Sequence, residues 1–344
     1  RATMPAAEAI RQLAGIQAQS PYAPYYGLWS RLENFEPSDL AAAIEGRTAV
    51  RLAIMRSTVH LVASEDALAW RPLIQPVVER MHWSVYGRYL DGLDRAELVR
   101  VGRELVEAEP MTFDQLGKRL IERWPDRNPA ALAMEIRTAA ALVQVPPRGI
   151  WGKGGVAAHT TAESWLGRTL VDKPDITAMI RRYLAAFGPA SVQDIQTWCG
   201  LTRLAPVVET MRDGLKVFVD ENGRELFDLP GAPRPSAETP APMRFLAEYD
   251  NTILSYADPS RIVSPEHRKR LMTNNGIVNG TLLVDGFVRG AWKINRANGV
   301  ATLAVMPFAP LAEDEQREIG AEGARLLRFA AERLDHAIEI APAS

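Results

Sequence analysis

The hydrophobic and polar positions between residues 37 and 229 repeat one order of elements three times. Each copy begins at a proline, and Ser38, Thr112 and Ser191 stand where a helix needs an N-cap oxygen for its free backbone N–H groups. Gln115 follows Thr112 at the spacing of a capping box. A short helix, a turn, a second helix and a β-rich segment then follow. The pattern therefore predicts three related units in tandem.

The second and third copies define this unit most clearly. In the second, the expected helices and strands are at 115–123, 130–142, 143–146 and 157–160. In the third, they are at 192–199, 206–213, 215–219 and 224–229. Asn222-Gly223 is a strong hairpin signal, and the glycine-rich segment 152–155 is expected at a hairpin tip because it lacks the spacing of a phosphate-binding loop. A helix–turn–helix followed by a hairpin is a winged helix; an unrelated helical array is the alternative.

The pattern changes after a proline-rich linker at residues 231–242. Strands are expected at 243–248, 281–284, 287–294 and 300–305, and an amphipathic helix at 313–339. A small β-barrel or a curled sheet packed by this helix accounts for them. The predicted fold class is α+β, with three tandem winged-helix units before the barrel domain. The expected boundaries are 1–90, 91–172 and 173–230 for the winged helices and 243–344 for the barrel domain.

Composition narrows the class of protein. The 344 residues are 47% apolar and 24% charged, as in an ordinary globular protein. We expect a soluble cytoplasmic protein, since no run of 18 apolar residues and no signal peptide is present. The lone Cys199 fits a reducing cytosol, and its apolar neighbours favour a buried core thiol over a nucleophile.

The net charge is −2, so any excess of positive charge must be confined to local clusters. One cluster holds Arg47, Arg51 and Arg56, and a second holds Arg261, Arg268, Lys269 and Arg270. Each is either a DNA contact or a solvated face. We expect no metal site, because the five histidines are scattered and the metal motifs HExxH and paired CxxC are absent.

Five motifs in a fixed order carry a family resemblance. They lie at 13–19, 55–62, 144–151, 249–254 and 283–292, and the first ends in Gln17-Ala18-Gln19. In order and spacing they resemble the AlkZ-like DNA glycosylases, which are bacterial winged-helix proteins. The resemblance implies that Gln17 and Gln19 are the catalytic residues, that alkylated bases in double-stranded DNA are the substrate, and that this C-terminal domain is present. Members usually begin with a further helix, so we expect residues to be missing before Arg1.

The second glutamine refines the resemblance. Other branches of the family carry Asp at that position, so Gln19 places the chain with a branch that includes an enzyme unhooking interstrand crosslinks. An amide is no proton acceptor at physiological pH, but its carbonyl can orient a water and its NH2 group can donate. This suffices for a cationic N7-alkylpurine, which leaves easily through an oxocarbenium-like sugar. The alternative is that both glutamines only cap or bridge helix ends.

Two further groups of polar residues have open roles. Arg56, Thr58 and His60 alternate with apolar positions and would share one face of a strand. These three either contact phosphate or the lesion near the active cleft, or are satisfied locally within a wing strand. Arg51, Arg56 and His60 are the DNA-binding candidates of this region. Asp250 and Asn251 either order a turn or approach DNA.

The predicted function is therefore a monofunctional DNA glycosylase, since no lysine stands beside the glutamine pair to form a Schiff base. It would act as a monomer on alkylated or crosslinked duplex DNA, without metal or organic cofactor. The alternative is a non-catalytic winged-helix regulator or lesion-binding resistance factor. We further expect both glutamines to be accessible on a concave basic surface, with no stacking pocket built from residues 22, 25, 26 and 29.

Overall fold

The computed structural model describes residues 1–271 and 278–343 and divides the chain into two compact units. The glutamine unit comprises Met4–Tyr22 and Pro37–Ala232. The C-terminal unit comprises Arg1–Thr3, Ala23–Glu36 and Pro233–Ser344. No helix in the described part of the chain is long and apolar enough to cross a membrane.

The glutamine unit mixes short strands with many helices. In chain order its elements are α1 (Ala6–Gln12), β1 (Ile16–Gln17), α3 (Pro37–Glu45), β2 (Ala49–Ala53), η1 (Met55–Ser57), β3 (Val59–Ala63), α4 (Ser64–Tyr86), η2 (Gly87–Tyr89), α5 (Arg95–Ala108), α6 (Phe113–Ile121), α7 (Pro129–Ala139), β4 (Leu142–Val145), β5 (Ala158–Thr161), α8 (Ala162–Leu166), α9 (Ile176–Phe187), α10 (Val192–Cys199), α11 (Ala205–Thr210), η3 (Arg212–Gly214), β6 (Lys216–Val219) and β7 (Glu225–Asp228).

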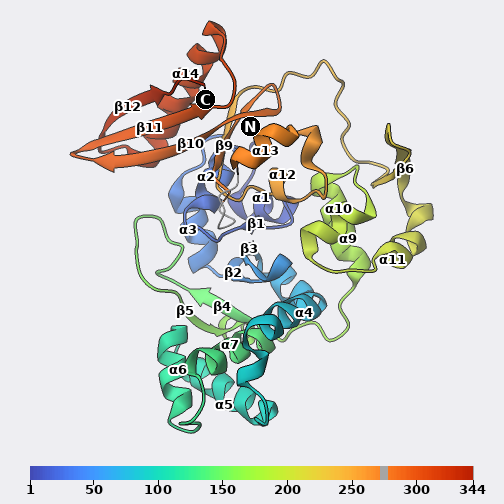
Figure 1. The fold of residues 1–344 in the computed structure, drawn as a ribbon, viewed down its shortest axis with the longest axis vertical. Helices are drawn as coiled ribbons and strands as arrows, with labels where there is room; N and C mark the ends of the chain where they lie inside the picture. Colours follow the sequence, from blue (N-terminus) through green and yellow to red (C-terminus); the bar gives the residue numbers. More distant parts are fainter. Residues whose placement is uncertain (272–277, 344) are drawn as a thin grey trace. The chain divides into compact units, whose positions relative to one another are not determined.

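One antiparallel sheet connects segments far apart in this unit. Its strand order is β1-β3-β2-β4-β5 (Figure 1). Gln17 of β1 pairs with His60 of β3, and Arg51 of β2 pairs with Gln144 of β4. The sheet therefore joins strands of the first predicted winged helix to strands of the second. The three motifs at 13–19, 55–62 and 144–151 meet on it.

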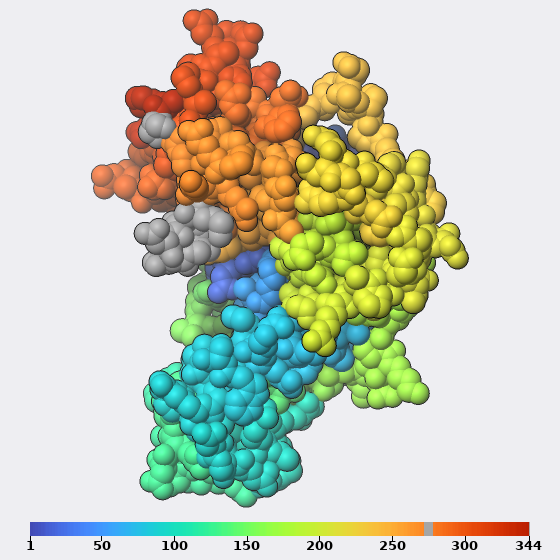
Figure 2. Space-filling model, turned by 45° about the vertical axis from the view of Figure 1, so that its right-hand side comes forward, coloured from blue at the N-terminus to red at the C-terminus, as the bar shows by residue number. Residues whose placement is uncertain are grey.

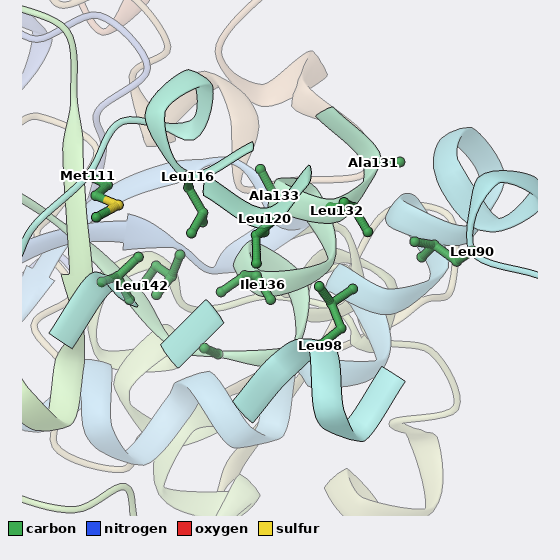
Figure 3. Packing of buried hydrophobic residues seen from close by; sticks show 12 residues of the cluster. Leu90, Leu98, Met111, Leu116, Leu120, Ala131, Leu132, Ala133, Ile136 and Leu142 are labelled. Carbon is green, nitrogen blue, oxygen red and sulfur yellow. The ribbon is translucent and has the colours of Figure 1, made fainter. Parts of the chain in front are cut away.

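The helices of the second copy form as the sequence predicts. Thr112 accepts a hydrogen bond from the backbone N–H of Gln115, and the Gln115 side chain accepts one from Thr112, which completes the capping box. Leu98, Leu120 and Ile136 are fully buried where α5, α6 and α7 pack together (Figure 3). Each such side chain contributes about 1.5–3 kcal/mol by leaving water.

The third copy contains the predicted helix pair and hairpin. Ser191 caps α10 through the backbone N–H of Asp194, and Asp220 orders the turn between β6 and β7. Trp198 of α10 packs its ring edge-on against Trp70 of α4. Figure 2 shows the yellow-green surface of this region adjoining the cyan surface of α4. The winged-helix assignment of the three copies and their boundaries stays a prediction.

The C-terminal unit is built around a second sheet. Its elements are α2 (Ala23–Trp29), β8 (Arg244–Leu246), α12 (Asn251–Leu254), η4 (Pro259–Arg261), α13 (Pro265–Leu271), β9 (Gly280–Val284), β10 (Phe287–Ala297), β11 (Val300–Pro307), α14 (Glu313–Ala331) and β12 (Asp335–Ile340).

The predicted β-barrel is wrong for the described residues. Their strands form an open five-stranded sheet in the order β12-β11-β10-β9-β8, so β12 and β8 are edges. The predicted helix over 313–339 is also wrong after Ala331, because Asp335–Ile340 is a strand. This strand pairs in parallel with β11, and α14 is the crossover that a parallel pair requires. The strand has only six residues and no regular alternation of polar and apolar positions, so the sequence did not separate it from the helix before it.

Candidate active site

Gln17 is brought to its place by a tight turn after α1. Ala14 and Gly15 both have positive φ, 52° and 89°, and a Cβ on Gly15 would lie 2.6 Å from the Val62 side chain. Glycine is therefore required where the chain approaches β3. The turn places Gln17 opposite His60 in the antiparallel ladder.

The two glutamines differ in exposure. The Gln17 side chain is buried at 5% exposure, whereas Gln19 lies beyond the end of β1 and is exposed. The expectation that both are accessible is therefore wrong for Gln17. The backbone N–H of Val59 approaches Gln19 Oε1 at 3.4 Å, a distance at the weak end for a hydrogen bond. The Gln19 amide is thus lightly held and open to solvent.

Arg56 lies in the turn η1, not in a strand as the alternation predicted. Its φ and ψ are 56° and 19°, and Ser57 follows with φ 59°. Two consecutive non-glycine residues in the left-handed region cost about 1–3 kcal/mol each, and such backbone persists only where its surroundings hold it. From this turn the Arg56 side chain reaches Gln17.

The Arg56 guanidinium joins three groups. Nη2 donates to Gln17 Oε1 at 2.6 Å, and Nη1 donates to the backbone carbonyl of Trp198 at 2.6 Å. Nη2 also lies 3.4 Å from His60 Nε2. Trp198 is in the last turn of α10, where a cation is favoured by the helix dipole. Burial lowers the pKa of Arg56 to about 10, so it remains a cation at neutral pH.

His60 is a neutral member of this cluster. Its side chain is fully buried. Since arginine only donates, Nε2 must accept, and the ring proton sits on Nδ1 facing the Thr58 carbonyl 3.1 Å away. Burial and the Arg56 charge lower the pKa of His60 to about 3. His60 therefore carries no charge at neutral pH, and its contacts are with the protein; a DNA contact by His60 stays a prediction.

Arg51 holds the backbone between the two glutamines. Its Nη2 donates to the Ala18 carbonyl at 2.8 Å, and its Nε donates to Gln144 Oε1 at 3.2 Å. Arg51 is only 2% exposed, and a Cβ on Gly149 would lie 2.6 Å from its Cδ. The motif at 144–151 thus supports the glutamine segment through Arg51. DNA contact by Arg51 or Arg56 likewise stays a prediction.

Comparisons with known proteins identify the family of this chain. A family model described as DNA glycosylase AlkZ-like matches residues 10–329. The chain belongs to the AlkZ-like DNA glycosylase family. It is similar to the interstrand DNA cross-link repair glycosylase of Streptomyces sahachiroi, with 24% identity over 94% of this chain and 90% of that protein. The family resemblance predicted from the five motifs is thereby confirmed.

The solved structure of the Streptomyces sahachiroi DNA glycosylase AlkZ shares the mixed α and β fold of this AlkZ-like chain. The TM-score is 0.80 at 20% sequence identity, and the match covers 99% of this chain and 95% of that one.

The second basic cluster lies in the C-terminal unit of this AlkZ-like protein. Arg261 packs over the Tyr256 ring, 4.5 Å from its centroid. Arg270 stacks over Phe308 at 4.4 Å and donates to the Phe308 carbonyl. Arg268 and Lys269 are exposed on α13. Their exposure suits phosphate contact, which stays a prediction for all four residues.

The aromatic residues after Gln19 divide between the two units. Tyr22 packs edge-on against Trp151 in the glutamine unit, with ring centroids 5.2 Å apart. Tyr25 is fully buried in α2, and Tyr26 and Trp29 pack against rings of the C-terminal unit. The rings of α2 therefore take part in packing within their own unit.

The structure shows how Asp250 and Cys199 are held. Asp250 caps α12 by accepting from the backbone N–H of Thr252, so it orders a turn. Cys199 is fully buried, and burial raises the pKa of its thiol to about 11, as expected of a core thiol. Sequence reasoning missed Gln144 and the Trp198 carbonyl as partners of the site. Gln144 opens one of the five motifs, which was its only signal.

Proposed function

We propose that this protein hydrolyses the N-glycosidic bond of N7-alkylated purines in double-stranded DNA, including purines in interstrand crosslinks. Gln17 and Gln19 carry the reaction, and Gln19 orients the attacking water. The protein acts as a monomer in the bacterial cytoplasm. Family membership supports glycosylase chemistry, and the name of the Streptomyces sahachiroi relative supports crosslinked DNA as a substrate.

One observation carries the assignment of roles. The Gln17 amide is buried and tied to a cationic side chain at 2.6 Å, while Gln19, two residues later, is exposed and lightly held. A rigid amide beside an accessible one is the arrangement that a preorganised site needs. A pair that only capped helix ends would instead bond to free backbone groups at those ends.

The substrate class follows from what these residues can do. An amide cannot remove a proton from water at neutral pH, so the leaving group must depart without strong help from a base. N7 alkylation makes the purine a cation, and its departure toward an oxocarbenium-like sugar needs a positioned water and well-placed dipoles. Burial keeps His60 neutral with a pKa of about 3, so it supplies no proton at pH 7.

The reaction is proposed to stop after base release. Strand cleavage by a bifunctional glycosylase needs an amine that forms a Schiff base with the sugar. No lysine precedes Lys118 in the sequence, so none neighbours Gln17 or Gln19 along the chain, and Lys118 itself is exposed on α6 and paired with Asp114. Water is therefore the proposed nucleophile, and neither a metal nor an organic cofactor is required.

The test is direct release of the free base. A duplex oligonucleotide with a single N7-methylguanine is incubated with excess protein, and free N7-methylguanine is measured by mass spectrometry. We expect release with the strand intact until alkali is added, and loss of release in Gln17→Ala and Gln19→Ala. A crosslinked duplex run on a denaturing gel should separate into two strands.

The competing outcome is equally clear. A non-catalytic regulator would retard the duplex in a native gel and release no base from it. Strand breaks without alkali would contradict the monofunctional assignment alone.

A further inference from the structure

We propose that Arg56 is a positioning residue that fixes the direction of the Gln17 amide, so that Gln17 acts in the reaction as a hydrogen-bond donor through Nε2. This rests on the proposed function, because it assigns a role to one member of the catalytic pair. Acceptance of a water hydrogen is then left to the carbonyl of Gln19.

The donor chemistry of arginine sets the amide direction. A guanidinium has five N–H donors and no acceptor, so the Gln17 atom that meets Arg56 Nη2 at 2.6 Å must be Oε1. Rotating the amide by half a turn would press an NH2 group against the guanidinium and lose a charge-assisted bond. The NH2 group is therefore the end of Gln17 left for other partners.

The same contact strengthens that donor. A hydrogen bond from a cation to an amide oxygen draws electron density from the amide nitrogen, and linked hydrogen bonds polarise one another. Gln17 is 5% exposed, so this polarisation acts where solvent screens it little. An acceptor atom on the lesion would meet a stronger donor than a free glutamine offers.

Arg56 is itself held from several sides. The Trp198 carbonyl accepts from Nη1, and the unprotonated Nε2 of the neutral His60 faces Nη2. Gly200, with φ 85°, lies against the Arg56 backbone, where a Cβ would come 3.3 Å from Arg56 Cα. The end of α10 thus fixes Arg56, and Arg56 fixes Gln17.

Gln17→Glu separates a donor from an acceptor. At neutral pH a carboxylate keeps an oxygen for Arg56 but has no hydrogen to donate. We expect single-turnover release of N7-methylguanine to fall by about 10²-fold, as for other lost preorganised donors, and to match Gln17→Ala. As pH falls, the protonated carboxyl regains a donor, so the Gln17→Glu rate, corrected for spontaneous release, should rise relative to wild type.

Arg56→Met tests the positioning step. It removes the donors but keeps an unbranched side chain, and we expect a roughly 10-fold slower release with duplex affinity unchanged, since part of a preorganised contact is lost. Arg56→Lys keeps one donor and should restore part of the rate. Arg137→Met is the matched control: Arg137 is also half-buried and donates to the Ser57 carbonyl at 3.0 Å, but it does not contact Gln17.

Each outcome has one meaning. Gln17→Glu that is as fast as wild type at pH 7 overturns the donor assignment, because the carboxylate can only accept. An equal loss in Arg56→Met and Arg137→Met overturns positioning and leaves only support of the turn. If the wild-type protein releases no base, the proposed function fails, but the positioning role of Arg56 can still be tested by NMR. The Gln17 side-chain NH2 signals are assigned by their loss in Gln17→Ala. Positioning requires that these signals shift in Arg56→Met and remain unshifted in Arg137→Met.

Discussion

The Arg31 guanidinium donates a hydrogen bond to each carboxylate oxygen of Asp250, with N–O distances of 2.9 and 2.8 Å, although 219 residues separate the two in sequence. Asp250 is 3% exposed, and Arg31 also donates to the Thr252 hydroxyl. Burial works to raise the pKa of Asp250, but the Arg31 charge and hydrogen bonds hold it below its ordinary value. The pair ties the segment before residue 37 to the start of the C-terminal unit's sheet.

We therefore expect Asp250→Asn to destabilise the C-terminal unit by about 3 kcal/mol, since it leaves a partly buried arginine without its anion. Urea denaturation followed by tryptophan fluorescence measures the change. Asp314→Asn is the control, because Asp314 and Arg317 form an exposed pair on α14, and such pairs contribute about 0–1 kcal/mol. Equal losses in the two variants would contradict the importance of the buried pair.

Buried histidines should make the fold sensitive to mild acid. Burial lowers the pKa of His60 to about 3 and of His159 to about 4, from an ordinary 6.5. Below pH 6.5 these histidines bind protons in the unfolded chain but stay unprotonated in the folded chain. The free energy of unfolding therefore falls as the pH falls from 6.5 to about 4. Each histidine contributes a slope of about 1.4 kcal/mol per pH unit within it.

His159→Gln should flatten this dependence by one proton relative to the wild-type protein. Denaturation curves between pH 4.5 and 7.5 measure both slopes. An unaltered slope in His159→Gln would mean that His159 charges within the folded protein.

Gln19 is the catalytic candidate whose removal should leave the fold intact, because its side chain is exposed. We expect Gln19→Ala to slow single-turnover release of N7-alkylguanine by about 10²-fold or more, as for loss of one positioned group, with DNA affinity within a few-fold. Gln12→Ala is the matched control, since Gln12 is also exposed and its side chain donates to Glu8, away from the site. Wild-type release from Gln19→Ala would remove Gln19 from the mechanism.

Much of this site follows from sequence order, and the rest depends on tertiary contacts. The Gln-x-Gln pair, the alternating segment around His60 and the third motif could be singled out as separate patterns. The alternation suggested a strand through Arg56, but local turn geometry with two positive φ values replaced it. The carbonyl of Trp198 leaves no trace in sequence, because any residue has one.

In the C-terminal unit, too, local patterns predicted some features, whereas others depend on tertiary contacts. Its strands β9, β10 and β11 begin within one residue of the predicted positions, because Asp285-Gly286 and Asn298-Gly299 mark the turns between them. Closure of the sheet into a barrel was predicted from the run of strands and the family resemblance, and the described residues leave the sheet open. Pairing between β11 and β12 spans a whole helix, so no local pattern reveals it.

The exposed cations of α13 give a prediction about salt. If Arg268 and Lys269 contact phosphates, replacing both with Ala should reduce the slope of log K against log salt by about 1.8, at about 0.9 per contact. Arg270 is treated separately, because its stacking on Phe308 has a structural role. Fluorescence anisotropy with undamaged duplex measures the slope. Arg317→Ala with Arg333→Ala removes the same charge from exposed positions and should not change it.

The pairing of β2 with β4 sets a timing for how this protein is made. Arg51 and Gln144 are 93 residues apart, so one edge of β2 stays uncovered until β4 has been synthesised. At about 5–20 residues per second, that wait is on the order of 5 to 20 seconds. An uncovered strand edge is a template for aggregation. A gene fragment that ends before Leu142 should therefore yield insoluble protein and not a soluble fragment with the glutamine segment. Synonymous codons that slow translation between residues 64 and 141 should lower the soluble yield of the full-length protein.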